Sequence, residues 1–291
     1  MNGPLTHADA TGAFLPAALT AYDDLVRRGL DHTYILHRRS SQAFGLNLFA
    51  PLDADGLRAI FRDLDCGDVE APKLEFEYSD PKNRLGEGTP PSPHTTQVDV
   101  LMRGRDASGS NVIALIEVKF TEIDFSHCSA FANPANPDRE VCREPGLFGG
   151  HPDRCFQIAN HGHGHRRYFE APGVSSVVPP AGIADGGGCW VRRGLNQPMR
   201  NLALAHTFLA DGDADRVVFA VCAPSAHEAM WRRFAEFRAA FPDVDCRWSL
   251  PLPAERVATH HPDGGAAIAA LYPLPSLQWS APATGSAAAA P

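Results

Sequence analysis

Residues 111–120 read NVIALIEVKF, an apolar run interrupted by two opposite charges, Glu117 and Lys119. A run this apolar is typical of a central strand that is covered on both faces. Because side chains along a strand alternate between its two faces, the two charges project from the same face. Isolated charges are costly in a covered strand, so this pair marks the strand as a candidate functional site.

A second strand-like segment, residues 96–102 (TQVDVLM), is interrupted by Asp99. Between the two segments lie residues 103–110 (RGRDASGS), which are rich in turn-forming residues. A hairpin centred near Ser108 places Asp99 opposite Glu117, because each lies nine positions from that centre. Two carboxylates and one ammonium then meet on one face of the sheet. This arrangement favours a metal ion with an activated water over a cross-strand salt bridge, which is the structural alternative.

An Asp followed by Glu-x-Lys on the next strand of a hairpin resembles the motif of the PD-(D/E)XK nuclease superfamily. Residues 40–52 (SSQAFGLNLFAPL) and 197–201 (QPMRN) are also similar to its restriction-endonuclease-like members, and the resemblance covers roughly residues 35–225. It implies a nuclease that uses Mg²⁺ or Mn²⁺ to hydrolyse phosphodiester bonds, with DNA favoured as the substrate.

The resemblance also implies a role for each residue of the motif. Asp99 and Glu117 would hold the ion, and the backbone carbonyl of Val118 would be a further ligand. Lys119 would orient or help deprotonate the attacking water and stabilise charge in the transition state.

Hydrophobic periodicity predicts a mixed α/β domain. Helices are predicted at residues 16–28, 40–49, 53–64, 196–210, 225–241 and 264–272, and strands at 73–78, 96–103, 112–121, 216–222 and 245–250. This order agrees with the αβββαβ core that the resemblance implies, a mixed central sheet with helices on both faces. One nuclease-like domain is predicted over residues 13–279, with a Cys- and His-rich insertion at about 123–193 and disordered ends at 1–12 and 280–291.

Gln197 and Arg200 lie one turn apart at the start of a predicted helix and therefore share a face. They resemble a glutamine motif that some nucleases of the superfamily place beside the scissile phosphate. The helix N-terminus and the guanidinium would both favour an anion there. Ordinary polarity at a helix start is an equally good interpretation.

Glu75 and Glu77 alternate with apolar neighbours on the first predicted strand. A solvent-facing edge is the favoured interpretation for both, with Glu77 as the candidate for a third carboxylate at the metal. Many relatives carry an acidic residue on the first core helix, whereas this chain offers only Gln42. That departure argues against a second metal ion.

The chain has 291 residues and a formal net charge of −8, so it lacks the overall positive charge that is typical of proteins that bind nucleic acid along their surface. This argues against a protein that coats DNA passively, and it argues less against a nuclease with an acidic metal site and local arginines. Seven cysteines without a basic, apolar export signal indicate a reducing cytoplasm, and no apolar run approaches the roughly 20 residues that span a membrane.

The predicted insertion contains four cysteines, Cys128, Cys142, Cys155 and Cys189. Four thiolates could bind zinc or an iron–sulfur cluster. Their spacings of 14, 13 and 34 positions contain no Cys-x₂-Cys knuckle, however, so unligated thiols are favoured. The same segment also contains several histidines: His127, His151, His161, His163 and His165.

A non-catalytic nucleic-acid-binding or interaction module on the same scaffold is the main functional alternative. It is disfavoured because a scaffold without catalysis has no need to bury the charges of Asp99, Glu117 and Lys119. No motor, methylase or helix-turn-helix pattern is present, so a specificity partner is expected to be encoded separately.

Overall fold

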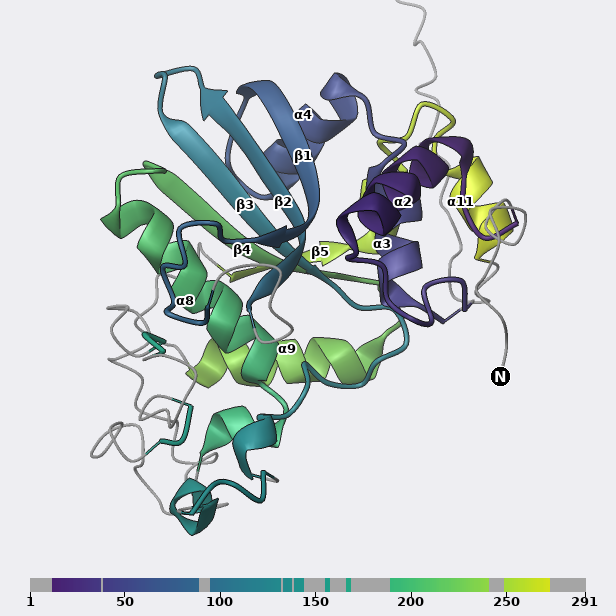
Figure 1. Cartoon of the computed structure of the whole chain (residues 1–291). Helices are drawn as coiled ribbons and strands as arrows, with labels where there is room; N and C mark the ends of the chain where they lie inside the picture. Colours follow the sequence, from purple (N-terminus) through teal and green to yellow (C-terminus); the bar gives the residue numbers. More distant parts are fainter. Residues whose placement is uncertain are drawn as a thin grey trace, which may run out of the picture.

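A five-stranded sheet forms the centre of the protein in the computed structural model (Figure 1). The strands β1 (Val69–Ser79), β2 (Gln97–Asp106), β3 (Asn111–Val118), β4 (Arg216–Ala223) and β5 (Ser249–Pro253) lie side by side in that order. The first three are antiparallel, and β3, β4 and β5 are parallel. The predicted mixed α/β sheet is therefore confirmed. The structure describes residues 12–37, 39–88, 95–131, 133–137, 139–143, 155–157, 166–168, 189–240 and 249–272.

Helices cover both faces of this sheet (Figure 1). One face packs against α8 (Asn196–Ala210) and α9 (Glu228–Ala240). The opposite face packs against α3 (Ser41–Phe49), α4 (Ala54–Asp63), α10 (Ala254–Ala258) and α11 (Ala266–Leu271). The first helix, α2 (Pro16–Arg28), packs on α3 in a smaller cluster at the side. The sheet is thus the middle of three layers.

Strand β3 is buried on both faces, as its apolar run predicts. Ile113 and Leu115 belong to the core beneath α8 and α9, whereas Ala114 and Ile116 belong to the core beneath α3 and α4. The alternation continues to Glu117, which therefore points toward α8 rather than toward solvent.

The register of the β2–β3 hairpin confirms the predicted turn centre. Val100 pairs with Ile116 and Leu101 pairs with Leu115. Continuing this register by one residue puts Asp99 opposite Glu117, as the symmetry about Ser108 predicts.

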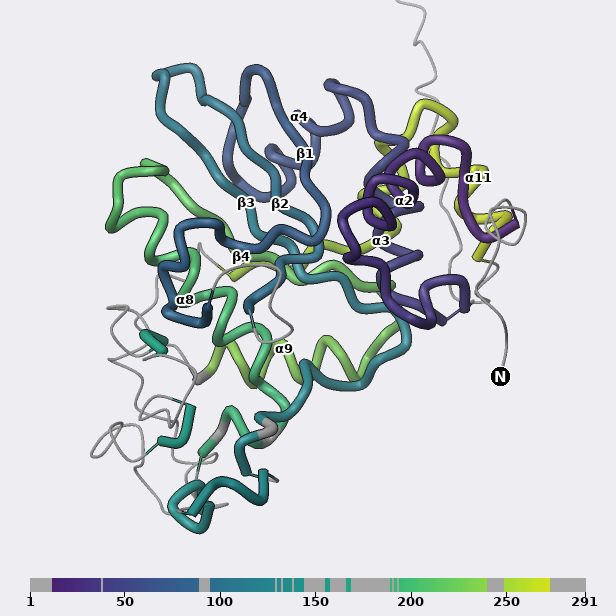
Figure 2. The backbone as a smooth tube through the Cα atoms, viewed as in Figure 1, coloured from purple at the N-terminus to yellow at the C-terminus, as the bar shows by residue number. Residues whose placement is uncertain are grey.

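Among its described residues, the connection from β3 to α8 includes the short 3₁₀ helices η1 (Ser129–Phe131), η2 (Arg139–Arg143) and η4 (Trp190–Arg193). Figure 2 shows this connection leaving the end of β3 and returning to the start of α8. Its buried residues, including Phe125, Val141 and Val191, join the core beneath α8 and α9. Much of the predicted insertion lies outside the described residues.

The prediction is least accurate at the C-terminal end. Residues 245–248 of the strand expected at 245–250 lie outside the described residues, and the described strand β5 is Ser249–Pro253. The short helix α10 was not predicted. Pro251 and Pro253 weaken the sequence signal of β5, and proline is tolerated there because β5 is an edge strand. Helix α10 has only five residues, too few for a helical period to be recognised.

None of the described helices is long and apolar enough to cross a membrane. The longest, α8, has 15 residues, whereas a span needs roughly 20.

Candidate active site

Strands β2 and β3 stop pairing through their backbones at the residues that carry the charges. The last pair is Val100 with Ile116, and beyond it the Oδ2 atom of Asp99 accepts a hydrogen bond from the Val118 amide at 2.6 Å. A side-chain oxygen thus takes the place of a backbone carbonyl. The carbonyl of a strand residue points to the same side as its amide, so the Val118 carbonyl also faces β2. Asp99 and the Val118 backbone therefore meet where the hairpin opens.

Glu117 and Lys119 form a buried ion pair beside this opening. The Lys119 Nζ atom lies 2.9 Å from Glu117 Oε1, and the two side chains are 6% and 0% exposed. Burial alone would lower the pKa of Lys119, but the Glu117 and Asp99 carboxylates reverse this effect and raise it. Lys119 is therefore held as an ammonium at neutral pH.

Helix α8 holds both members of this pair. Lys119 Nζ donates a hydrogen bond to Gln197 Oε1 at 2.9 Å, and Asn201 Nδ2 donates one to Glu117 Oε2 at 2.7 Å. Gln197 and Asn201 are four residues apart and so lie on one face of the helix. The structure thus brings Gln197 to Lys119, and it adds Asn201, which the sequence analysis did not assign.

Arg200 forms a largely buried ion pair with Glu87. Its Nη2 atom is 2.8 Å from Glu87 Oε1, and its Nε atom donates to Thr96 Oγ1 at 3.0 Å. Glu87 also accepts hydrogen bonds from the Thr96 amide and the Tyr168 hydroxyl. Arg200 therefore links α8 to the segments that precede β2, and this engagement argues against a role as a phosphate contact.

Arg200 and Glu87 give the first testable expectation. Replacing Arg200 with Met should lower the free energy of unfolding by about 3–5 kcal/mol, because it leaves the buried Glu87 carboxylate without its cation. Urea unfolding of Arg200→Met, Glu87→Gln and the double variant measures the coupling between them. Arg143→Met, in an exposed pair with Glu140, is the matched control and should change stability by less than about 1 kcal/mol. Unchanged stability of Arg200→Met would contradict this role.

Glu77 is buried at the same end of the sheet, so the favoured interpretation of it as a solvent-facing residue is wrong. Its side chain accepts a hydrogen bond from Gln42 Nε2 at 2.8 Å, and the β1–β2 register places it opposite Asp99. Glu75 is exposed, as expected. Glu77 has a backbone φ of 50°, in the left-handed region that non-glycine residues rarely adopt. This strained backbone breaks the strand alternation and turns Glu77 inward.

Two carboxyl groups of the cluster, Asp99 and Glu77, resist ionisation. Burial raises the pKa of Asp99 well above its usual range, and the neighbouring Glu117 and Glu77 carboxylates raise it further. Burial also raises the pKa of Glu77 to about 7, although the hydrogen bond from Gln42 acts in the opposite direction. Lys119 supplies one positive charge against three carboxyl groups. A bound cation would favour the ionised form of these carboxyl groups.

The donor atoms present fit a single hard divalent ion. Glu117 Oε1 is buried and receives no aligned hydrogen bond within the described residues, although it lies 2.9 Å from the Lys119 ammonium. Among those residues, no three His, Cys, Asp or Glu side chains are arranged around one ion position. Two carboxylates and a backbone carbonyl, completed by waters, are nevertheless a ligand set that Mg²⁺ accepts.

The raised pKa of Glu77 predicts a pH-dependent loss of stability without metal. Folded Glu77 keeps its proton up to about pH 7, whereas the unfolded chain releases it near 4.5. The folded state thus binds more protons between these values, so stability falls as pH rises through this window and is level above it. The loss should be on the order of 3 kcal/mol.

Three histidines, His32, His206 and His261, have a pKa lowered by burial, and they contribute the opposite slope. The quantity to measure is therefore the difference in unfolding free energy between wild type and Glu77→Gln in EDTA, from about pH 5 to about pH 8. Wild type should lose stability relative to the variant over this range, and Mg²⁺ should reduce the loss. A difference that does not change with pH would contradict the burial of an ionisable Glu77.

Three of the four cysteines of the predicted insertion, Cys128, Cys155 and Cys189, line a separate cavity. Most of the histidines of this insertion lie outside the described residues, and the Nε2 atom of the described His127 lies 3.0 Å from Asp124 Oδ2.

One comparison with known families gives a match. The model of the family described as "Restriction Endonuclease associating with ARP" matches residues 23–260. No curated protein and no solved structure matches the chain. The matched range contains every residue of the cluster around Lys119.

Proposed function

The chain belongs to the family described as "Restriction Endonuclease associating with ARP", and on this premise we propose that it is a metal-dependent nuclease. We take its αβββαβ order of elements as a restriction-endonuclease-like core, within the PD-(D/E)XK superfamily. The observation that carries the proposal is the meeting of Asp99, Glu117 and Lys119 where β2 and β3 separate. The proposed reaction is hydrolysis of phosphodiester bonds, with DNA as the favoured substrate.

In this proposal Asp99, Glu117 and the Val118 carbonyl hold Mg²⁺ or Mn²⁺. The ion, when bound, would lower the pKa of a water and offset the charge that develops on the phosphate. Lys119 donates hydrogen bonds to the attacking water or to a phosphate oxygen. Its raised pKa favours this role over that of a general base. Gln197 and Asn201 hold Lys119 and Glu117 in place from α8.

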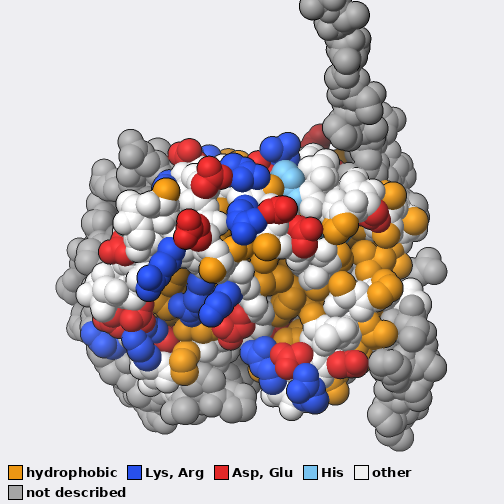
Figure 3. Space-filling model, turned by 90° about the horizontal axis from the view of Figure 1, so that it is seen from above, with side chains coloured by type: hydrophobic (Ala, Val, Ile, Leu, Met, Phe, Trp, Pro, Cys, Tyr) orange, Lys and Arg blue, Asp and Glu red, His pale blue; other side chains and the backbone are white. Residues whose placement is uncertain are grey.

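Nucleic-acid binding by this chain would depend on local contacts. On the face shown in Figure 3, Lys and Arg side chains are interspersed with Asp and Glu and form no continuous basic band. A net charge of −8 agrees with this distribution. Binding would therefore rest on the metal and on individual basic side chains rather than on a broad positive field.

A non-catalytic binding module is the alternative. Such a module gains nothing from three buried charged side chains, because their desolvation costs free energy that binding does not recover. The strained backbone at Glu77 is a second cost at the same place. Both features favour catalysis.

The family description names an association with ARP. We therefore propose a separately encoded partner, which would supply the target specificity for which the chain contains no recognised motif.

The test is an assay of the full chain on linear and supercoiled duplex DNA, single-stranded DNA and RNA. Each is incubated with Mg²⁺, with Mn²⁺ or with EDTA. The proposal predicts cleavage that requires the ion and is lost in Glu117→Gln. Binding of nucleic acid without cleavage, identical for wild type and Glu117→Gln, would favour the non-catalytic module.

A further inference from the structure

Four cysteines that are far apart in sequence come together in the connection between β3 and α8. Cys128 precedes η1, Cys142 lies in η2, Cys155 lies in the described stretch 155–157, and Cys189 precedes η4. The Cys189 amide donates a hydrogen bond to the Cys142 carbonyl at 2.8 Å. Cys142, Cys155 and Cys189 are buried, and Cys128 is half-buried.

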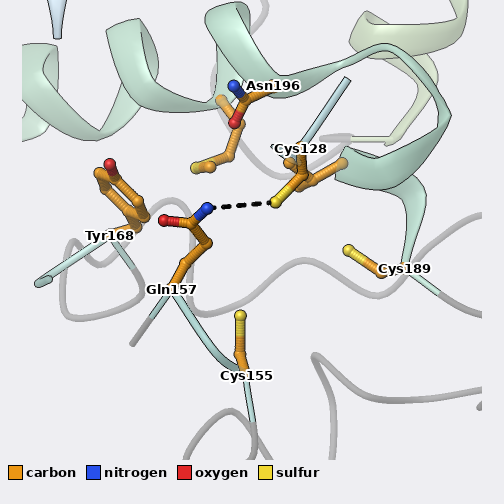
Figure 4. Close-up of a pocket in the computed structure, with 8 residues that line it drawn as sticks. Cys128, Cys155, Gln157, Tyr168, Cys189 and Asn196 are labelled. Carbon is orange, nitrogen blue, oxygen red and sulfur yellow. Dashed lines mark hydrogen bonds between the residues drawn. The ribbon is translucent and has the colours of Figure 1, made fainter. Parts of the chain in front are cut away.

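Three of the sulfurs point into one small space. Cys128, Cys155 and Cys189 line a cavity of about 20 Å³, and Figure 4 shows their sulfur atoms directed toward its centre. Gln157 Nε2 donates a weak hydrogen bond to Cys128 Sγ at 3.5 Å. The cavity reaches the first turn of α8 through Asn196 and Met199.

The fourth thiol belongs to the same group. Burial is the main cause that raises the pKa of Cys189, and the sulfurs of Cys155, Cys128 and Cys142 add to it. Burial likewise raises the pKa of Cys142, with a further contribution from Cys128. Each of the four sulfurs therefore lies within electrostatic reach of another.

Buried cysteines often act only as small apolar side chains, and two others in this protein do so. Cys66 and Cys222 are buried among aliphatic and aromatic side chains beneath α3 and α4. The four cysteines of the connection differ from Cys66 and Cys222 because their sulfur atoms lie near one another. Cys142 lies in a 3₁₀ helix, and the other three lie in chain without regular secondary structure. The 3₁₀ helices of the connection have three to five residues and little stability of their own.

We propose that Cys128, Cys142, Cys155 and Cys189 together bind a thiophilic metal centre, as four thiolates. The shared chemistry is sulfur coordination, which suits a zinc ion or an iron–sulfur cluster. No three of the described ligand side chains yet surround one ion position, so binding would draw the sulfurs inward. The centre would tie η1, η2 and η4 to the first turn of α8. The proposal does not depend on nuclease activity.

The first measurement is the metal content of the full chain, purified without oxygen and without a His-tag. One zinc per chain, or iron with inorganic sulfide and visible absorption, supports the proposal. Which of these two results is obtained identifies the centre as zinc or as an iron–sulfur cluster. Cys142→Ala and Cys189→Ala should each lose most of the metal. Cys66→Ala is the matched control, because Cys66 is equally buried but lies outside the group, and it should retain the metal.

A second measurement uses only the wild-type chain, in case the variants fail to fold. The four thiols should be protected from a thiol reagent until a chelator or an acid pulse removes the metal, and the metal should be released as they react. No bound metal after supply of Zn²⁺, or of Fe²⁺ with sulfide, would overturn the proposal.

Histidine binding is tested separately, because His161, His163 and His165 alternate with glycine outside the described residues. A variant with all three replaced by Ala should retain the metal. Metal that is lost from this variant but kept by Cys142→Ala and Cys189→Ala would overturn the proposal.

Discussion

Replacing Glu117 with Gln is expected to abolish Mg²⁺-dependent cleavage of DNA while the protein stays folded. The ion contributes several kcal/mol of charge stabilisation, so its loss should reduce the rate on the order of 10³-fold or more. Asp99→Asn should have the same effect. Metal-free stability should not fall for Asp99→Asn, because this change removes a carboxylate that its neighbours repel, whereas Glu117→Gln also removes the partner of Lys119 and should lose some stability. Single-turnover cleavage rates and urea unfolding measure the two effects.

Asp106→Asn is the matched control for this experiment. Asp106 lies at the other end of β2, in the hairpin turn, where its side chain accepts hydrogen bonds from Ser108 and Ser110. Cleavage by this variant should equal that of wild type. A strong loss of stability in Glu117→Gln and Asp99→Asn, together with a wild-type chain that cleaves no nucleic acid, would instead identify the cluster as a structural ion pair.

Replacing Lys119 with Met is expected to lower both the stability of the protein and the rate of cleavage. It removes the ammonium that faces the buried Glu117 and Asp99 carboxylates, which should cost about 3–5 kcal/mol without metal. The loss should shrink at low pH, where the carboxylates take up protons, and it should be partly restored by Mg²⁺. Even with saturating metal, turnover should fall about 10²–10⁴-fold, because water and phosphate lose their cationic donor.

Lys82→Met is the corresponding control. Lys82 pairs with Asp213 at 2.8 Å, but its side chain is 58% exposed, so the change should cost less than about 1 kcal/mol. If Lys119→Met were as stable as wild type and cleaved at the same rate, Lys119 would have neither proposed role.

The core of the site could be predicted from sequence because its geometry is local. The hairpin is symmetric about Ser108, so counting residues gives the pairing of Asp99 with Glu117, and the apolar run at 111–120 shows that β3 is covered. The bounds of α8 were also predicted, since its helical period is regular and Pro198 marks its first turn.

The features that were missed depend on backbone strain or on tertiary contacts. The inward position of Glu77 follows from its φ of 50°, which no propensity indicates for glutamate. Asn201 could have been found, because it lies one turn after Gln197 on the same face. Arg200 was paired with Gln197 instead, because its charge suits a phosphate. Only the structure shows that Arg200 is engaged by Glu87. The four thiols lie 14, 13 and 34 positions apart in sequence, so their proximity in space is seen only in the folded structure.

The central claim is that Asp99 and Glu117 share one divalent ion. The most direct measurement is anomalous diffraction from crystals soaked in Mn²⁺. We expect one strong anomalous peak in contact with both carboxylates and with the Val118 carbonyl, and no peak there in Glu117→Gln. Saturating Mn²⁺ with no peak at this position, and Glu117 still paired with Lys119, would contradict the account.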